Sequence, residues 1–178
     1  MDRFIGKYRG TVLNNVDPEM RGRLMLSVPD VLSLMPSTWA EPCVPLAGPT
    51  GPPMGVYMVP PIGAGVWVEF EQGDINRPIW VGCRWGARSD IPTLANAGLP
   101  ATPNIVIQSF TQQAIVVSDL PGPTGGIMLK SATGASLLVN DTGIYIDNGK
   151  GAKITLIGPV VKIDGNPVNI NNGSLNIL

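Results

Sequence analysis

The sequence predicts an all-β protein made of a small N-terminal barrel and a C-terminal region of repeated strands. Three observations support this prediction. The 178 residues include 22 glycines and 18 prolines, which is typical of short strands joined by many turns rather than of long helices. The first half contains five or six short apolar segments separated by turn residues. The last third repeats a pair of aliphatic residues followed by a glycine.

Residues 1–86 contain the strands of the predicted barrel. Residues 23–28 alternate cleanly, because Leu24, Leu26 and Val28 fall on one face of an extended chain. Residues 32–37 form either one helical turn or a loop. Five or six short strands within about 85 residues favour an OB-type barrel, closed or partly closed. The other strands are expected at residues 4–12, 39–45, 56–59, 66–71 and 79–84.

Residues 87–104 are expected to link the barrel to a second domain, residues 105–178. The linker has no hydrophobic periodicity and contains Pro92, Pro100 and Pro103. Residues 105–107 and 114–117 are rich in aliphatic side chains and predict a strand pair that leads into the repeats.

Seven short segments form the repeat between Gly125 and Leu178. Each segment places two aliphatic residues two positions apart, so that both side chains point to the same face of a strand. Glycines recur at intervals of 7 to 9 residues, and pairs such as Asn148-Gly149 supply the positive-φ corners of sharp turns. The segments are residues 127–129, 137–139, 144–146, 154–156, 161–163, 168–170 and 175–177.

A repeat of this length is one strand and one corner, and it cannot bury its apolar face alone. One solution is a meandering antiparallel sheet that packs on the first half as in an ordinary sandwich. The other is a set of strands from several chains wound around a common axis. A lone meander leaves open edges and one wide apolar face, so we expect an intertwined trimeric β-helix, a needle. Its dry core is expected to contain Ile127, Leu129, Leu137, Val139, Ile144, Ile146, Ile154, Leu156, Val161, Ile163, Val168 and Ile170.

The composition argues against several classes of function. Charged residues make up only 14% of the chain and the net charge is −1, which suits a subunit buried in an assembly and not a basic, phosphate-binding surface. The absence of histidine excludes Ser-His-Asp and Cys-His catalysis and histidine-bearing metal sites. We therefore expect no enzyme, catalytic residue, metal site or cofactor. Cys43 and Cys83 are expected to be reduced core residues.

Other functional interpretations have weaker support. Glu69 and Glu71 lie about 7 Å apart on one strand face, within reach of the spacing of glycosidase carboxylates, but any half-exposed strand shows the same alternation. A β-helical carbohydrate enzyme or fibre needs a charged cluster on one face of the repeats, whereas their charges are interpreted as scattered. These charged residues are Lys130, Asp147, Lys150, Lys153, Lys162 and Asp164.

The alternative function is that of an OB-fold nucleic-acid-binding protein with a β-rich oligomerisation tail. OB barrels bind single strands by stacking bases on aromatic side chains beside a basic groove. The nearly balanced charge argues against this function, and packing is the expected role of the tryptophans. The residues that would serve it are Trp39, Trp67, Trp80, Trp85, Arg21, Arg23, Arg77 and Arg84.

Several motifs of the first half resemble the OB domain of contractile-tail spike proteins. This family includes phage baseplate assembly protein V, the cell-puncturing tail spikes and the VgrG spikes of type VI secretion and extracellular injection systems. Its members follow the OB domain with a trimeric β-helix, so the resemblance covers nearly the whole chain. The motifs are Gly10-Thr11-Val12, Asp17-Pro18, Gly22-Arg23-Leu24, Val28-Pro29, residues 59–74 (VPPIGAGVWVEFEQGD) and residues 78–82 (PIWVG).

The resemblance implies a homotrimeric, structural central spike. Such a spike binds a baseplate hub at its OB end, makes no use of nucleic acid, and is driven through a target envelope when the tail sheath contracts. Some relatives hold iron at the tip through a His-x-His motif and others carry a lysozyme domain, but this chain has no histidine and its linker is too short for that domain. The apolar ending is implied to bind a PAAR-type tip protein through Leu175, Ile177 and Leu178.

No apolar run reaches the roughly 18 residues of a membrane span, and no signal peptide opens the chain. We therefore expect synthesis in the cytoplasm and assembly into a phage tail or a contractile injection particle.

Overall fold

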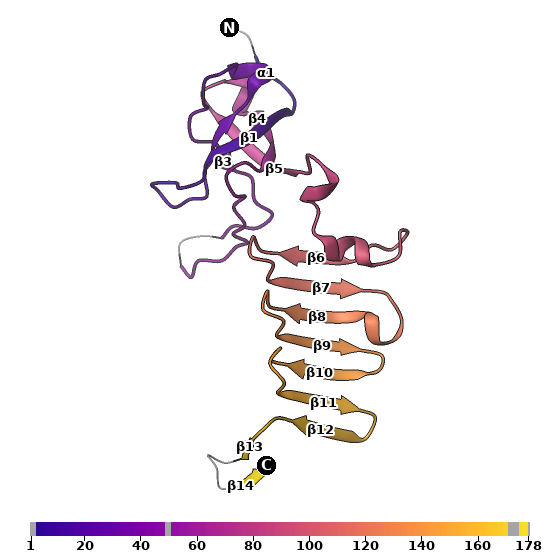
Figure 1. The fold of residues 1–178 in the computed structure, drawn as a ribbon. Helices are drawn as coiled ribbons and strands as arrows, with labels where there is room; N and C mark the ends of the chain where they lie inside the picture. Colours follow the sequence, from indigo (N-terminus) through magenta and orange to yellow (C-terminus); the bar gives the residue numbers. More distant parts are fainter. Residues whose placement is uncertain (1–2, 49–50, 171–174, 178) are drawn as a thin grey trace. The chain divides into compact units, whose positions relative to one another are not determined.

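The computed structural model describes residues 3–48, 51–170 and 175–177 (Figure 1). The chain divides into two compact units, which we call unit 1 (Met1–Asp90) and unit 2 (Ile91–Leu178). Strands form most of the regular secondary structure in both units, which confirms the predicted all-β class.

Unit 1 contains a five-stranded sheet with the order β2-β1-β4-β5-β3. Neighbouring strands are antiparallel except for β3, which runs parallel to β5. The predicted barrel is open, because within the described residues the outer strands β2 and β3 approach each other only through an isolated bridge between Leu24 and Ala40. The strands are β1 (Tyr8–Asn14), β2 (Met25–Ser27), β3 (Glu41–Pro42), β4 (Gly65–Phe70) and β5 (Pro78–Arg84).

Three expectations for unit 1 are wrong. Residues 56–59 form no strand, and the strand expected at 39–45 shrinks to the two residues of β3. Prolines at 42, 45 and 60 explain both differences, because proline has no N–H with which to continue a ladder. The helix α1 spans Pro29–Leu32, so residues 33–37 form the loop that the sequence left open as an alternative to a helical turn. Cys43 and Cys83 are free thiols, as expected, but both are exposed rather than in the core.

The core of unit 1 is formed by alternate residues of its strands. Val12, Val66 and Val68 are almost completely buried, as strands with one inward face require. Trp80 is also buried, and its indole N–H donates to the backbone oxygen of Gly22 at 3.1 Å. The remaining members of this cluster are Leu24, Leu26, Val28, Ala40 and Phe70.

A buried carboxylate closes the loop between β1 and β2. Asp17 accepts backbone N–H bonds from Glu19, Arg21 and Arg23 at 2.9 to 3.2 Å. It also accepts a bond from the guanidinium of Arg23 at 2.7 Å, and this guanidinium lies over the ring of Trp39. The bond from Arg23, together with the backbone N–H groups, holds the pKa of the Asp17 carboxyl far below its usual range, although burial opposes the shift. The Asp17-Pro18 and Gly22-Arg23 motifs are therefore parts of one network.

Unit 2 contains a seven-stranded sheet in which each strand pairs antiparallel with the next, from β6 to β12 (Figure 1). The last two strands, β13 (Val168–Ile170) and β14 (Leu175–Ile177), pair separately. All strands expected between residues 105 and 177 are confirmed. The strands of the sheet are β6 (Ile105–Gln108), β7 (Ala114–Ser118), β8 (Gly126–Lys130), β9 (Ser136–Asn140), β10 (Gly143–Asp147), β11 (Lys153–Ile157) and β12 (Val160–Asp164).

Strand pairing within unit 2 follows an antiparallel meander. Every ladder of β6 to β12 joins consecutive strands of the same chain. Short hairpin turns make this pairing local, and each interior strand is hydrogen-bonded on both sides by its own chain. The sandwich and the trimer differ, then, only in what covers the faces of this sheet.

Three alternate hairpins of the sheet use the same five-residue turn, at residues 109–113, 131–135 and 148–152. The backbone N–H of the first residue donates to the carbonyl of the fifth at 2.8 to 3.1 Å. The side-chain oxygen of Ser109, Ser131 or Asn148 accepts the N–H of the fifth residue at 2.9 to 3.1 Å. The fourth residue has a positive φ in each turn, 67° at Gln112, 98° at Gly134 and 106° at Gly151.

The helical elements are all short. Besides α1 they are the 3-10 helices η1 (Glu71–Gly73), η2 (Arg88–Asp90), η3 (Thr93–Ala97) and η4 (Gly122–Thr124). In the described part of the chain, a helix with the length and apolar character needed to cross a membrane is not found.

Replacing Asp17 by Asn is expected to lower the melting temperature at pH 7, because the amide cannot accept the charge-assisted bonds from Arg23. The folded-state pKa of Asp17 lies below the unfolded value of about 3.9, so its stabilisation is present above that pH and is lost as the pH falls below it. Thermal unfolding between pH 7 and pH 2.5 should show the two proteins converging in acid. Asp30→Asn, an exposed control in the same unit, should show no such convergence. A difference in melting temperature between the Asp17→Asn variant and the unchanged protein that stays constant at all pH values would show that the ionised Asp17 carboxylate is not the source of the stabilisation.

Replacing Gln112 by Gly is expected to stabilise unit 2 by about 0.5–1 kcal/mol. A non-glycine residue at positive φ costs energy that glycine does not, and this gain exceeds the entropy that glycine adds to the unfolded chain. Denaturant titration measures the difference. The neighbouring Thr111→Gly should destabilise, since Thr111 has no positive φ to relieve. A loss of stability in both variants would show that the turn is not strained at Gln112.

Candidate functional site

One face of the seven-stranded sheet consists of aliphatic side chains alone. The strand registers align two rows across the sheet, each with one residue from each of the seven strands. Residues paired directly in an antiparallel sheet share a face, and positions i and i+2 share it too. We call this surface the aliphatic face. Its first row is Ile105, Val117, Ile127, Val139, Ile144, Leu156 and Val161, and its second row is Ile107, Ile115, Leu129, Leu137, Ile146, Ile154 and Ile163.

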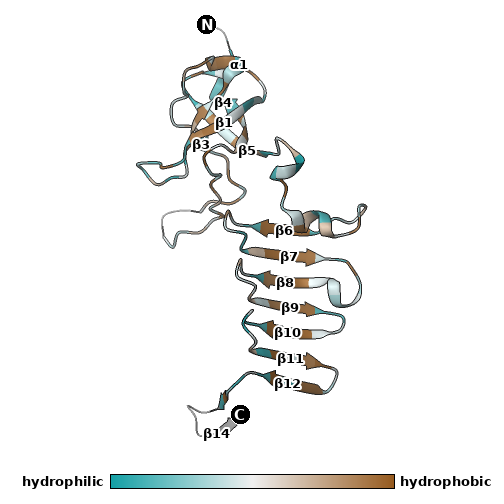
Figure 2. Cartoon of the chain, viewed as in Figure 1, coloured by the Kyte–Doolittle hydropathy of each residue, from teal (hydrophilic) through white to brown (hydrophobic). Residues whose placement is uncertain are grey.

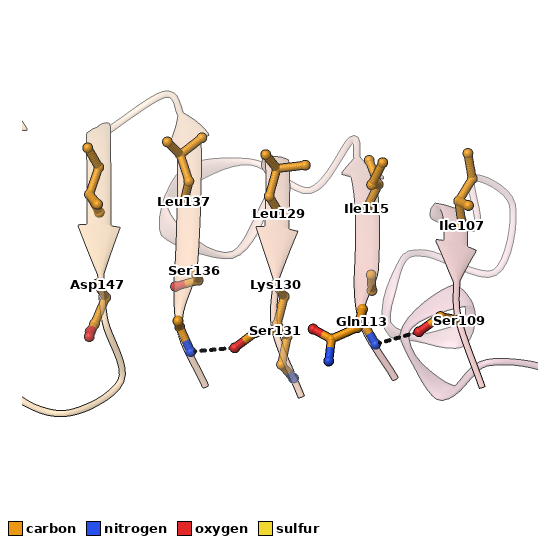
Figure 3. A pocket seen from close by; sticks show the side chains of 13 residues that line it. Ile107, Ser109, Gln113, Ile115, Leu129, Lys130, Ser131, Ser136, Leu137 and Asp147 are labelled. Carbon is orange, nitrogen blue, oxygen red and sulfur yellow. Dashed lines mark hydrogen bonds between the residues drawn. The ribbon is translucent and has the colours of Figure 1, made fainter. Parts of the chain in front are cut away.

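The close-up in Figure 3 shows part of the second row. Ile107, Ile115, Leu129 and Leu137 lie side by side on neighbouring strands and point the same way. They line a shallow hollow together with polar groups of the adjoining turns. Figure 2 shows that hydrophobic residues fill the strands of the sheet, whereas hydrophilic ones gather in the turns. The aliphatic face is therefore continuous and has no polar group inside it.

The chain covers the opposite face in part but leaves the aliphatic face bare. On β7, Val116 of the opposite face is only 3% exposed, while its neighbours Ile115 and Val117 on the aliphatic face are 46% and 37% exposed. The short helices η3 and η4 contact β6 and β9. Exposure of the aliphatic face reaches 68% at Ile105 and 64% at Val161. An apolar surface this wide marks an interaction site in soluble proteins.

The charged residues of the strands lie on the opposite face. Lys130, Asp147, Lys153 and Asp164 occupy one row across β8, β10, β11 and β12, and Lys162 belongs to the adjacent row. Lys153 and Asp147 form an ion pair at 2.7 Å, and this bond lowers the pKa of Asp147 and raises that of Lys153. The interpretation of these charges as scattered is wrong, because alternate positions of neighbouring strands come together when the strands pair. Only Lys150 lies in a turn.

The aliphatic face contains ten of the twelve residues expected in the needle core. Val168 and Ile170 lie instead on β13, outside the seven-stranded sheet. Leu175 and Ile177, two of the three expected tip-binding residues, lie on β14, and Leu178 lies outside the described residues. Four members of the face are not among the residues expected from the sequence: Ile105, Ile107, Ile115 and Val117. Their spacing of two residues is the same signal as in the repeats, but they belong to the two strands expected only to lead into the repeats.

The residues that favoured other functions are used in structural contacts. Glu69 pairs with Lys7, and Glu71 pairs with Arg77, so each carboxylate has its own cation. Among the arginines considered for phosphate binding, Arg23 is held by Asp17, Arg21 contacts Glu19 and Glu41, and Arg77 is the partner of Glu71. Trp80 is buried in the core. In residues 3–48, 51–170 and 175–177, no group of three His, Cys, Asp or Glu side chains is placed to hold a metal ion.

The aliphatic face can associate with a second apolar surface, and it offers no group for acid–base or nucleophilic chemistry. Fully burying an aliphatic side chain contributes about 1.5–3 kcal/mol, and these side chains remain near half exposed in the single chain. Covering the face therefore adds roughly 1 kcal/mol per residue. Summed over the two rows, this free energy supports a stable association between chains.

Two sequence-family models match the chain and together cover most of it. Residues 8–85 match the type VI secretion system/phage-baseplate injector OB domain. Residues 104–176 match the phage baseplate V C-terminal trimerisation domain, a range that contains the whole aliphatic face. A search of the curated proteins finds no match. Both matching families are structural baseplate components.

Substituting Ile154 by Asp is expected to prevent assembly, because every copy would place a carboxylate in a dry interface. The matched control is Thr155→Asp on the same strand, whose side chain lies on the opposite face beside Lys162. The control should assemble like the unchanged protein. Sedimentation of the purified proteins measures the mass of the assembly in each case. If the Ile154→Asp protein forms an assembly of the same mass as the unchanged protein, the aliphatic face is not the interface.

Proposed function

The chain belongs to the phage baseplate V family of baseplate spike proteins, and on this basis we propose that three copies associate through the aliphatic face into the central spike of a phage tail or contractile injection machine. The chain is thus a structural baseplate component with a trimerisation domain. The aliphatic face is the observation that supports the finer proposal, since it is the surface that the chain leaves uncovered within that domain.

Three sheets turned inward enclose all their aliphatic faces around one axis. Each chain then supplies one wall of a three-sided needle, which is the form that the expected trimeric β-helix takes along β6 to β12. Seven strands spaced by about 4.8 Å make this part of the needle about 29 Å tall. The charged face, with its ion pair between Asp147 and Lys153, remains in water.

Stiffness is the property that such a needle needs in order to pierce an envelope. Each interior strand is hydrogen-bonded on both sides within its chain, and a closed core leaves no apolar face for other proteins to bind. We propose that sheath contraction drives this needle through the target envelope. The OB unit binds the baseplate hub, and the apolar end at Leu175, Ile177 and Leu178 binds a PAAR-type tip protein. The order of the two domains along the chain supports this polarity.

Light scattering on the purified chain tests the proposal. The expected mass is about three times 18.8 kDa. A truncation that ends at Pro103 should be monomeric, because it lacks every strand of the aliphatic face. A monomeric full-length chain would overturn the spike and leave the sandwich arrangement, in which unit 1 covers the sheet. A trimeric truncation would move the main interface to unit 1.

A further inference from the structure

A long segment without charge lies in unit 1, between Glu41 and Glu69. None of the 27 residues from 42 to 68 is Lys, Arg, Asp or Glu, although 14% of the chain as a whole is charged. Residues 65–68 belong to β4 and help to form the core, which explains the end of this segment. The remainder contains no strand beyond Pro42 and needs another explanation.

Part of this segment forms an arm, which we define as residues 46–48 and 51–58. Two backbone bonds tie its ends together, from the N–H of Gly48 to the oxygen of Met54 at 2.8 Å and from the N–H of Val56 to the oxygen of Leu46 at 3.0 Å. The two sides approach so closely that a Cβ on Gly48 would lie 2.2 Å from the side chain of Met54. The arm is therefore a built, hairpin-like element rather than a loose connection.

The base of the arm and the adjoining Pro60 contact the loop between β1 and β2. The side-chain amide of Asn15 donates to the backbone oxygen of Pro60 at 3.1 Å. The ring of Tyr57 packs next to Gly22, where a Cβ would lie 3.3 Å from the ring. These contacts hold the arm in one place on unit 1.

Large apolar side chains of the arm face solvent. Tyr57 is 72% exposed, Met58 60% and Met54 57%, and Leu46 is exposed as well. Leu46, Met54 and Tyr57 line a groove with Arg21 and Glu41, which form an ion pair with each other. Exposed apolar groups gathered on one ordered element mark a contact surface. Methionine suits such contacts because its flexible side chain adapts to the partner.

We infer that the arms of the three copies pack against one another, so that unit 1 carries a second contact between copies. This inference rests on the proposed trimer. The trimerised unit 2 tethers three copies of unit 1, which raises their effective concentration to the order of mM. Around a threefold axis identical residues approach each other, so any charge on the arm would meet its own copies at short range. A charge-free arm avoids this repulsion.

A different protein is a poorer match for this surface. Contacts between unlike proteins gain specificity and association rate from complementary charges, whereas the arm has no charge of its own, and the two charged groups of its groove, Arg21 and Glu41, neutralise each other in an ion pair. The charges of unit 1 lie on other segments, where Arg21, Arg23 and Arg77 are paired within the chain. The hub is thus expected to bind elsewhere on unit 1.

Disulfide cross-linking of the full-length chain tests the inference. Cys43 and Cys83 are first replaced by Ser, since both are free and exposed. Tyr57→Cys and Met54→Cys are then introduced separately, with Leu34→Cys as the control. Leu34 is fully exposed and follows α1, which lies at the opposite end of unit 1 from the arm (Figure 1). Under mild oxidation the arm variants should form covalent dimers at least tenfold faster than the control.

Each outcome bears on a separate claim, because the mass of every variant is measured before oxidation. A monomeric mass for all variants would overturn the proposed trimer itself. A trimeric mass with cross-linking no faster than in Leu34→Cys would overturn the contact between arms and leave the trimer intact. In that case, rapid maleimide labelling of Tyr57→Cys in the trimer would show that the arm is free to bind a different protein, such as the hub. If Tyr57→Cys fails to fold, Met54→Cys and Met58→Cys decide the question.

Discussion

The strand register of the C-terminal sheet is the constraint on which the rest of this protein depends. Side chains alternate between faces with a period of two, so a slip of one residue in any strand would move its aliphatic residues to water and its lysines or aspartates to the other face. On β12, for example, Lys162 would replace Val161 or Ile163 in the aliphatic rows. The shared five-residue turns oppose such a slip, because each binds its fifth residue through both backbone and side chain.

Charged residues stabilise the structure of both units. In unit 1 the carboxylate of Asp17 organises a loop through three backbone N–H groups and Arg23. In unit 2 the pair formed by Asp147 and Lys153 lies on the face opposite the aliphatic one. The proposed trimer gives sparse charge and the two exposed apolar surfaces, the aliphatic face and the arm, one explanation, because it covers both surfaces when copies of the chain associate. A chain with these features functions as a subunit and gains its stability in the assembly.

Local pattern predicted the strands of unit 2 better than those of unit 1. In unit 2 the strands are short, sequential and joined by glycine turns, so local preferences and final pairing agree. In unit 1 the ladder depends on partners distant in the sequence, such as β1 with β4 and β3 with β5. Residues 56–59 form a short apolar run like a buried strand but find no partner in that sheet, and β3 is shortened by prolines. An apolar run alone does not distinguish these cases.

The sequence by itself determined the all-β class, the repeat, the absence of histidine chemistry and ten of the residues on the aliphatic face. These features follow from composition and from the two-residue period, which need no knowledge of long-range contacts. Only the tertiary structure decided that Ile105, Ile107, Ile115 and Val117 extend that face, that the charged residues of the strands share the other one, and that residues 46–48 and 51–58 form an arm. The first two depend on the register in which neighbouring strands pair, and the arm depends on contacts with residues distant in the sequence, such as that of Tyr57 with Gly22.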